Sequence, residues 1–301
     1  MFNIYSSNRF QEISEIASIT PIHFSLFDSH EIECQIYGLQ LGNESTYGIY
    51  TPFWLPNFAY LLNDPMKLEN YLLELIRLTK KANPNGSITI RFPPYFYCKT
   101  IQYLNFLLEK IGFQTINFAL WQMIDIRQFN SQKNYENHLK YSSRKVLKKL
   151  QEKNSRLELL NFNDINGISC AYNLINRNRL SIGVNLKYST KYLLNLINIY
   201  GEKIKIFNFL VDETPVAAAI THIPQDGILY IAAWGDYGHT LSGSPMYQFA
   251  SALVKYCLDN DLKFLDFGIS SDLKLYTPNL FKFKQNIGCD TTTQRTYKSN
   301  F

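Results

Sequence analysis

One stretch in the second half of the chain constrains the fold most, because it switches between the hydrophobic periods of strands and of a helix. Residues 227–234 and 263–268 have the pattern of strands, and 245–260 has that of an amphipathic helix. A polar loop over 235–244 joins the first strand to the helix and contains Gly238 and Gly243. Ser244 is a good N-cap, and Pro245 suits the first helical position. The stretch therefore predicts a β-α-β unit.

The start of the predicted helix is a candidate anion site. Backbone N–H groups in the first turn of a helix have no carbonyl partner within it, so they can bind a phosphate or pyrophosphate. The residues expected to bind such a phosphate-bearing group are Leu241, Ser242, Gly243, Ser244 and Met246. A plain β-α-β connection without a ligand is the alternative, since such connections are common.

The rest of the chain continues the alternation of strands and helices. In the first half, strands are expected over 32–41, 88–92 and 116–126, and helices over 68–78 and 103–111. The polar segment 127–134 then interrupts the apolar pattern. A chain of 301 residues has room for one large domain or two of ordinary size. We predict a mixed α/β fold with two lobes, 1–127 and 128–301.

Composition excludes several classes of protein. The chain is 46% hydrophobic and 18% charged, so it can bury a substantial core and is not disordered. Its net charge of +5 suits an anionic substrate without requiring nucleic acid. The cysteines show no C-x-x-C pair and the histidines no metal-ligand spacing, so no metal is expected. With neither a signal-peptide pattern nor a membrane-length apolar run, the sequence predicts a cytoplasmic protein without a membrane span; the oligomeric state is left open.

A basic amphipathic helix is expected over 135–153. Leu139, Val146 and Leu150 fall on one face, and Lys140, Arg144 and Lys148 fall on another. The basic face is either a solvated surface or an electropositive strip for a phosphate-bearing partner.

From residue 135 onward, the order of segments resembles the GNAT-type acyltransferases, and among them the Fem-like group. That group includes peptidoglycan aminoacyltransferases and acyl-CoA N-acyltransferases. The resemblance rests on residues 141–146 (YSSRKV), 216–220 (VAAAI), 242–245 (SGSP), 264–268 (FLDFG) and 280–288 (LFKFKQNIG). In the first half, 47–53 and 110–113 suit a degenerate lobe of the same type. The resemblance implies tandem GNAT-like lobes, the second with better preserved motifs, although the loop before Ser244 lacks the basic residue with which the GNAT acyl-CoA loop starts.

The resemblance also implies an activity. It predicts an N-acyltransferase that moves an acyl group from acyl-CoA, as a co-substrate and not a permanently bound cofactor, to an amine. The acceptor implied is a sugar or nucleotide-sugar of cell-envelope or polysaccharide synthesis. One alternative is an aminoacyl-tRNA-dependent transferase, which the basic helix favours and the lack of a coiled-coil insertion disfavours. A catalytically silent binding protein of the same fold is the other.

Three residues are candidates for the chemistry. An amine that attacks a thioester or ester needs a donor to the carbonyl oxygen, a proton acceptor and a clamp on the phosphates. Lys284 matches the F-K position of the resembled group, which implies electrostatic assistance; the alternative is an ordinary strand-edge lysine. Asp266 is a candidate proton acceptor or orienting group, or else forms a turn. Tyr230 offers a hydroxyl, or else packs in the core.

A second set is expected to bind the acceptor. Arginine guanidinium groups bind anionic groups through paired hydrogen bonds. The candidates for substrate binding are Arg144, Arg177, Arg179, Tyr237 and Phe283.

Overall fold

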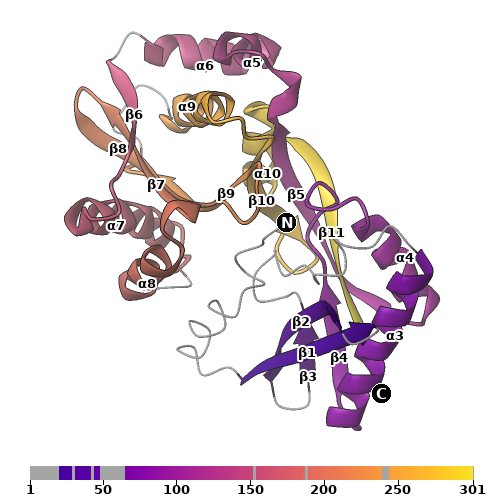
Figure 1. The fold of residues 1–301 in the computed structure, drawn as a ribbon. Coiled ribbons are helices and arrows are strands. Elements are labelled where there is room, and N and C mark those ends of the chain that lie inside the picture. Colours follow the sequence, from indigo (N-terminus) through magenta and orange to yellow (C-terminus); the bar gives the residue numbers. More distant parts are fainter. Residues whose placement is uncertain are drawn as a thin grey trace. The chain divides into compact units, whose positions relative to one another are not determined.

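The computed structural model describes residues 20–28, 31–41, 44–47, 65–151, 154–186, 189–238 and 244–300 (Figure 1). The chain divides into two compact units. The first comprises Met1–Trp121, Ser271–Tyr276 and Thr292–Phe301, and the second Gln122–Ser270 and Thr277–Thr291. Each lobe predicted from the sequence is one continuous segment, whereas the first unit also includes Ser271–Tyr276 and Thr292–Phe301 from the C-terminal half of the chain.

In its described residues, the first unit is a sheet with the two helices α3 and α4. Its elements are β1 (Thr20–Asp28), β2 (Glu31–Leu41), β3 (Glu44–Tyr47), α3 (Pro65–Ala82), β4 (Ser87–Arg91), α4 (Ile101–Lys110), part of β5 (Gln114–Asp125) and part of β11 (Asp290–Asn300). The strand order is β1-β2-β3-β4-β11-β5. Leu72 and Leu75 of α3 and Leu104 and Leu108 of α4 are buried, at the spacing expected of amphipathic helices. The helices predicted in this half are thus confirmed.

The second unit contains the candidate site. After the end of β5 come η2 (Ile126–Gln128), α5 (Gln132–His138), α6 (Tyr141–Gln151), β6 (Ser155–Leu159), α7 (Ile165–Ser181), α8 (Thr190–Tyr200), η3 (Gly201–Lys203), β7 (Ile204–Val211), β8 (Thr214–His222), β9 (Ile228–Asp236), α9 (Met246–Asp259), β10 (Phe264–Asp272) and α10 (Pro278–Asn286). The strand order is β5-β10-β9-β8-β7-β6, antiparallel from β6 to β9 and parallel between β9 and β10. Figure 1 shows α7 and α8 on one face of this sheet and α9 with α5 and α6 on the other.

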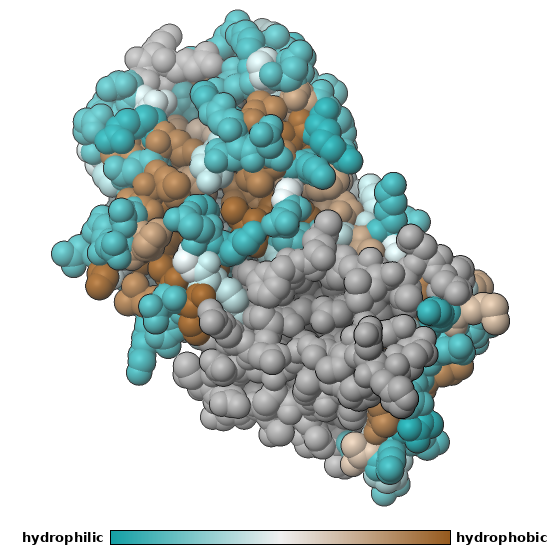
Figure 2. All heavy atoms as spheres, in the orientation of Figure 1, coloured by the Kyte–Doolittle hydropathy of each residue, from teal (hydrophilic) through white to brown (hydrophobic). Residues whose placement is uncertain are grey.

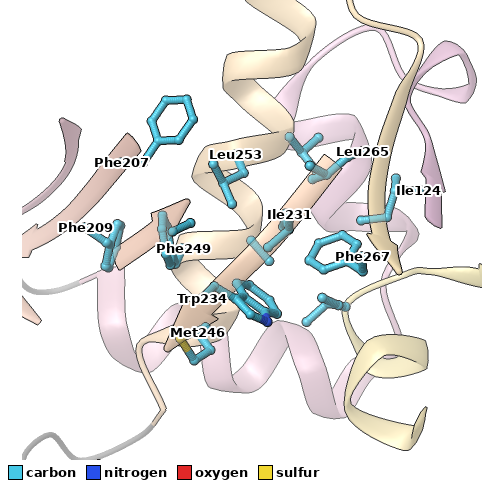
Figure 3. Close-up of a cluster of buried hydrophobic side chains, with 14 of the residues drawn as sticks. Ile124, Phe207, Phe209, Ile231, Trp234, Met246, Phe249, Leu253, Leu265 and Phe267 are labelled. Carbon is cyan, nitrogen blue, oxygen red and sulfur yellow. The ribbon is translucent and has the colours of Figure 1, made fainter. Parts of the chain in front are cut away.

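The core of this unit lies between α9 and the sheet. Leu253 of α9 is buried with Phe207 and Phe209 of β7 and Ile231 of β9 (Figure 3). Phe209 stacks on Phe249 with ring centroids 5.5 Å apart. Burial of large side chains such as these contributes about 1.5–3 kcal/mol each, so packing of α9 on the sheet supplies much of the stability of the unit.

Two sequence predictions about helices were wrong in detail. The single helix expected over 135–153 is two helices, because Leu139 adopts an extended conformation (φ −65°, ψ 154°) and buries its side chain. No proline or glycine marks this break. The helix expected from Pro245 begins instead at Met246, with Pro245 at the N-cap and the Met246 N–H donated to Ser244 Oγ at 3.3 Å.

Candidate functional site

Strands β9 and β10 pair along only a short part of their length. Each has nine residues, but the register covers only Phe264 with Ile228, Leu265 with Leu229, and Asp266 with Tyr230. Beyond that last pair the strands separate. Backbone groups on the facing edges then have no partner across the gap, and such groups need one from elsewhere. The separation is therefore a place where a ligand can bind to the backbone.

Gly268 lies on β10 just beyond the last pair, in a left-handed conformation with φ of +68°. Its N–H donates to Asp266 Oδ1 at 2.7 Å. Lys284 of α10 donates from Nζ to the carbonyl oxygens of Phe267, Gly268 and Ile269, at 2.7, 3.0 and 3.0 Å. Successive carbonyls of a regular strand point to opposite sides, so the turn at Gly268 is what allows three of them to meet one ammonium group. We call Asp266, Gly268 and Lys284 the β10 clamp.

Lys284 is not the strand-edge lysine considered as an alternative, because it lies on a helix and is 2% exposed. The pKa of Lys284 is lowered to about 8, chiefly by burial; the charges of Cys289 and Asp266 act to raise it, and that of Arg179 adds to the lowering. The carbonyl oxygens favour the ammonium form, which hydrogen-bonds to them. An ammonium group has three N–H donors, so all of them are used by β10 in this arrangement.

Tyr230 completes the group of predicted catalytic residues. It is half-buried, and its ring lies over Gly268, where an added Cβ would be 3.3 Å from Tyr230 Cε2. The structure therefore brings Tyr230, Asp266 and Lys284 together around one glycine. Asp266 is fully buried and bonds locally to the backbone, as the turn-forming alternative expected.

Aromatic rings line the same region. Trp234 of β9 packs against Phe267 of β10 and Phe283 of α10, with centroids 5.1 and 5.9 Å apart. Figure 3 shows Trp234 and Phe267 pointing toward each other beside Met246. Phe283 also meets Tyr247 of α9 edge to face at 5.4 Å. The predicted substrate residue Phe283 thus belongs to an apolar wall at the place where β9 and β10 separate.

The second half of α7 contributes polar groups at the end of β9. Arg177 lies over the ring of the exposed Tyr237, with its guanidinium carbon 5.9 Å from the ring centroid. Asn178 donates from Nδ2 to the Asp236 carbonyl oxygen at 2.9 Å and fits against Gly235. Arg179 is close enough to lower the pKa of Lys284 through its charge. The predicted residues Arg177, Arg179 and Tyr237 are thus associated with the same part of the unit.

Arg144 has a different role. Its Nη1 donates to the carbonyl oxygens of Asn137 and Leu139, at 2.8 and 2.9 Å. These carbonyls lie at the C-terminal end of α5, where helix carbonyls need external donors. The structure therefore gives Arg144 a bond to the backbone, whereas the sequence suggested contact with the substrate.

The predicted donor loop is only partly visible. Leu241, Ser242 and Gly243 lie outside the described residues, so their expected role stays a prediction. Ser244 is exposed, whereas the Met246 side chain is buried in the core and its backbone N–H donates to Ser244 Oγ.

Two hydroxyl groups hold the end of α10, the helix that carries Lys284. Tyr135 donates to the Ile287 carbonyl oxygen and Ser143 to that of Asn286, both at 2.7 Å. Tyr135 is fully buried, and burial raises the pKa of its hydroxyl well above the usual range. The position of Lys284 therefore depends on α5 and α6.

Gln122 was not predicted from the sequence. It is fully buried on β5, donates to the Phe281 carbonyl oxygen at 3.3 Å, and accepts a hydrogen bond from Ser270. It thereby links β10 to the first half of α10. The signal in the sequence was a glutamine between Trp121 and Met123 in the otherwise apolar run 118–124, since buried polar groups are kept where they are bonded. Asn178 had no comparable signal.

Among the residues that the structure describes, no helix is long and apolar enough to cross a lipid bilayer. Nor do three or more His, Cys, Asp or Glu side chains in those ranges gather as metal ligands would.

Comparison with known proteins identifies the fold. No protein-family model and no curated protein sequence matches this chain. Among solved structures, FemX is similar over 99% of this chain and 92% of its own, with 12% identity and a TM-score of 0.72. The C-terminal domain of a putative lysylphosphatidylglycerol synthetase from Agrobacterium fabrum covers 98% of this chain and 88% of its own, with 11% identity and a TM-score of 0.61.

A third similar structure is a tandem GNAT protein from the clavulanic acid biosynthesis pathway. It covers 94% of this chain and 83% of its own, with 7% identity and a TM-score of 0.50. At these identities the likeness is one of fold. The expected resemblance is confirmed at that level: the chain has the mixed α/β fold shared by Fem-like and GNAT-type proteins.

Proposed function

We propose that this protein transfers an acyl group from an activated donor to an amine where β9 and β10 separate. The observation that carries the proposal is the separation itself, with the β10 clamp beside it, in a fold shared with FemX and a tandem GNAT protein. Two of the fold neighbours are named as a putative lysylphosphatidylglycerol synthetase and a tandem GNAT protein, the latter with AcCoA in its name, and these names support acyl transfer as the general reaction.

The chemistry can be assigned to groups in this region. The amine attacks the donor carbonyl, a C–N bond forms, and negative charge develops on the carbonyl oxygen. The C–S or C–O bond then breaks, and the proton lost by the amine ends on the leaving thiol or hydroxyl group. Backbone N–H groups of β9 beyond Tyr230 face the gap without a partner on β10, so they are suited to donate to that oxygen. N–H groups in the first turn of a helix have no carbonyl partner within it, so the start of α9 is suited to the donor phosphates.

Lys284 acts on this reaction through β10. Because its three N–H donors bind β10 carbonyls, it fixes the backbone beside the reacting groups, and its positive charge adds to the field there. Direct donation to the carbonyl oxygen would require the ammonium group to release one strand carbonyl. The acceptor is proposed to be an amine on an anionic molecule such as a nucleotide-sugar, bound through Arg177 and Arg179.

For the donor we propose acyl-CoA. A second candidate is aminoacyl-tRNA, which is favoured by the basic surface that α6 and Lys140 form. Lys140, Lys145, Lys148 and Lys149 are exposed there, and residues 137–151 contain no acidic residue. Figure 2 shows hydrophilic side chains over α5 and α6. Such a surface suits phosphate groups.

The two donors can be told apart directly. Mass spectrometry of small molecules and RNA that copurify with the protein is the first measurement. Purified protein is then given acetyl-CoA or charged tRNA, each with a panel of amine acceptors, and product formation is followed by mass. Transfer from acetyl-CoA supports the first donor. Transfer from charged tRNA alone, lost in a K145E/K149E variant, supports the second.

Lys284→Met is the test of the chemical role, since it removes the charge and keeps most of the volume. We expect turnover to fall about 100-fold or more, because the β10 backbone beside the reacting groups loses three hydrogen bonds and the positive charge; loss of one preorganised donor in an active site has an effect of that size. Thermal melting of the same variant is the folding control. If a folded Lys284→Met protein turned over normally, Lys284 would have no part in the reaction. If no donor and acceptor pair gave product, the protein would be a silent binding protein of the same fold.

A further inference from the structure

A cavity in the second unit lies away from the proposed reaction. Its volume is about 440 Å³, within the range of small-molecule sites, and its walls come from α5, α6, β6, β7 and α9. None of the residues around it belongs to the β10 clamp or to the aromatic rings beside it. What it binds is therefore a separate question from acyl transfer.

The wall formed by α9 is polar, with Gln248 and Ser251 buried and Lys255 and Asp259 exposed. Gln248, Ser251, Lys255 and Asp259 follow one another at helical spacing along the cavity. A second stripe of the same helix, with Phe249 and Leu253, packs in the core. The helix thus has one face for the core and another for the cavity, and polar residues persist in buried places chiefly where they serve a function.

A hydrogen-bonded network joins this wall to α5. Ser251, which is 2% exposed, donates to Glu136 Oε1 at 2.8 Å. Gln132 donates from Nε2 to Ser251 Oγ at 2.9 Å. The network fixes the Glu136 carboxylate at the side of the cavity, and a carboxylate has acceptor sites for further donors.

Gln248 points to a missing partner. It is 7% exposed and lines the cavity, and its Oε1 has no hydrogen-bond partner among the described residues. A buried amide oxygen left without a donor costs stability, so such atoms are rare unless something else satisfies them. Its Oε1 has almost no accessible surface in this arrangement, so the amide would have to turn toward the cavity before the N–H donor of a ligand could satisfy it.

The charges around the cavity balance. Glu136 and Asp259 are acidic, and Arg156 and Lys255 are basic. Lys255 pairs with Asp259, and Arg156 with Glu213, but both pairs are exposed and can rearrange at little cost. Leu147, Leu157 and Phe209 provide an apolar wall. We infer that the cavity binds a small zwitterion with an apolar body, of the amino-acid or dipeptide class, with its ammonium group at Glu136 and Gln248 and its carboxylate at Arg156 and Lys255.

Calorimetric titration of the full chain tests this inference with defined probes. The zwitterions are L-alanine, L-leucine and L-alanyl-L-alanine, and propylamine and propionate each carry one of the two charges. We expect at least one zwitterion to bind with a Kd below about 1 mM, and the singly charged probes to bind at least about tenfold more weakly. If no zwitterion bound at about 10 mM, or the singly charged probes bound equally well, the inference would be overturned.

Two variants place the binding in the cavity. Glu136→Gln keeps the shape of the side chain and should weaken zwitterion binding about tenfold or more. Ala252→Phe should fill the space and abolish binding. The matched control is Glu202→Gln, an acid paired with Lys205 outside the cavity, which should bind as the wild type does. Unchanged affinity in both cavity variants would contradict the assignment; should one variant fail to fold, the other variant and the comparison of probes on the wild type still decide it. None of these measurements depends on acyl transfer.

Discussion

The ring of Tyr230 covers Gly268 so closely that a methyl group on that glycine would lie 3.3 Å from Tyr230 Cε2. The contact joins Tyr230, the last residue of β9 that pairs with β10, to Gly268, which lies where β10 has separated from β9. Asp266 and Lys284 act on the same glycine, through its N–H and its carbonyl oxygen. The shape of the backbone at Gly268 therefore determines how the strands part.

Gly268→Ala should destabilise the protein and reduce turnover. A left-handed backbone costs about 1–2 kcal/mol for a residue with a Cβ, and the Tyr230 contact adds to that cost. Urea unfolding measures the stability. The matched control is Gly183→Ala, because Gly183 also has a positive φ (+74°) but an added Cβ there meets nothing within 4 Å. Equal losses in the two variants would show that the contact with Tyr230 has no energetic weight.

Lys284 should make stability depend on alkaline pH. Its folded pKa of about 8 is below the usual 10.5, so between these values the unfolded chain binds more protons and the contribution of Lys284 to stability rises with pH. From pH 7 to 9.5, the free energy of unfolding of the wild type should rise relative to that of Lys284→Met by about 2 kcal/mol. Parallel urea titrations of the two proteins measure this difference. A difference that is constant with pH would contradict the lowered pKa.

His222 should have an effect of the same sign at acid pH. Burial lowers the pKa of this β8 side chain to about 3. As pH falls below about 6.5 the unfolded chain takes up a proton that the folded chain does not, so stability should be lost at about 1.4 kcal/mol per pH unit. His222→Gln should lose less stability than the wild type between pH 6.5 and 4.5. His138→Gln, at an exposed position, is the control and should follow the wild type.

Arg144→Ala distinguishes a structural arginine from one that binds substrate. Loss of its two bonds to the end of α5 should cost about 1 kcal/mol of stability. If Arg144 has only that role, the KM for the acceptor should not change, and Lys148→Ala should alter neither quantity. A raised KM with unchanged stability would restore Arg144 to the acceptor site.

Much of the second unit could be predicted from its sequence, because apolar spacing and turn residues report local structure directly. The strands and the helix of the β-α-β unit appear where they were expected, and Lys284, Asp266 and Tyr230 do come together. Their meeting point could not be predicted, because the sequence does not show that Gly268 has a positive φ. Nor does it show that three carbonyls converge on Lys284, since that depends on α10 packing against a distorted strand. The break at Leu139 was missed because tertiary packing, and not a helix-breaking residue, causes it.

The hydroxyl groups of Tyr135 and Ser143 have a consequence for where this unit can be said to begin. A shortened chain starting at β6 would keep every strand from β6 to β10, and by strand count would look complete. It would nonetheless leave the carbonyls of Asn286 and Ile287 without those donors, at the end of the helix that holds Lys284. A fragment that keeps these bonds, and the one from Gln122 to the Phe281 carbonyl oxygen, therefore starts no later than Gln122, so α5 and α6 are part of the unit and not a linker to it.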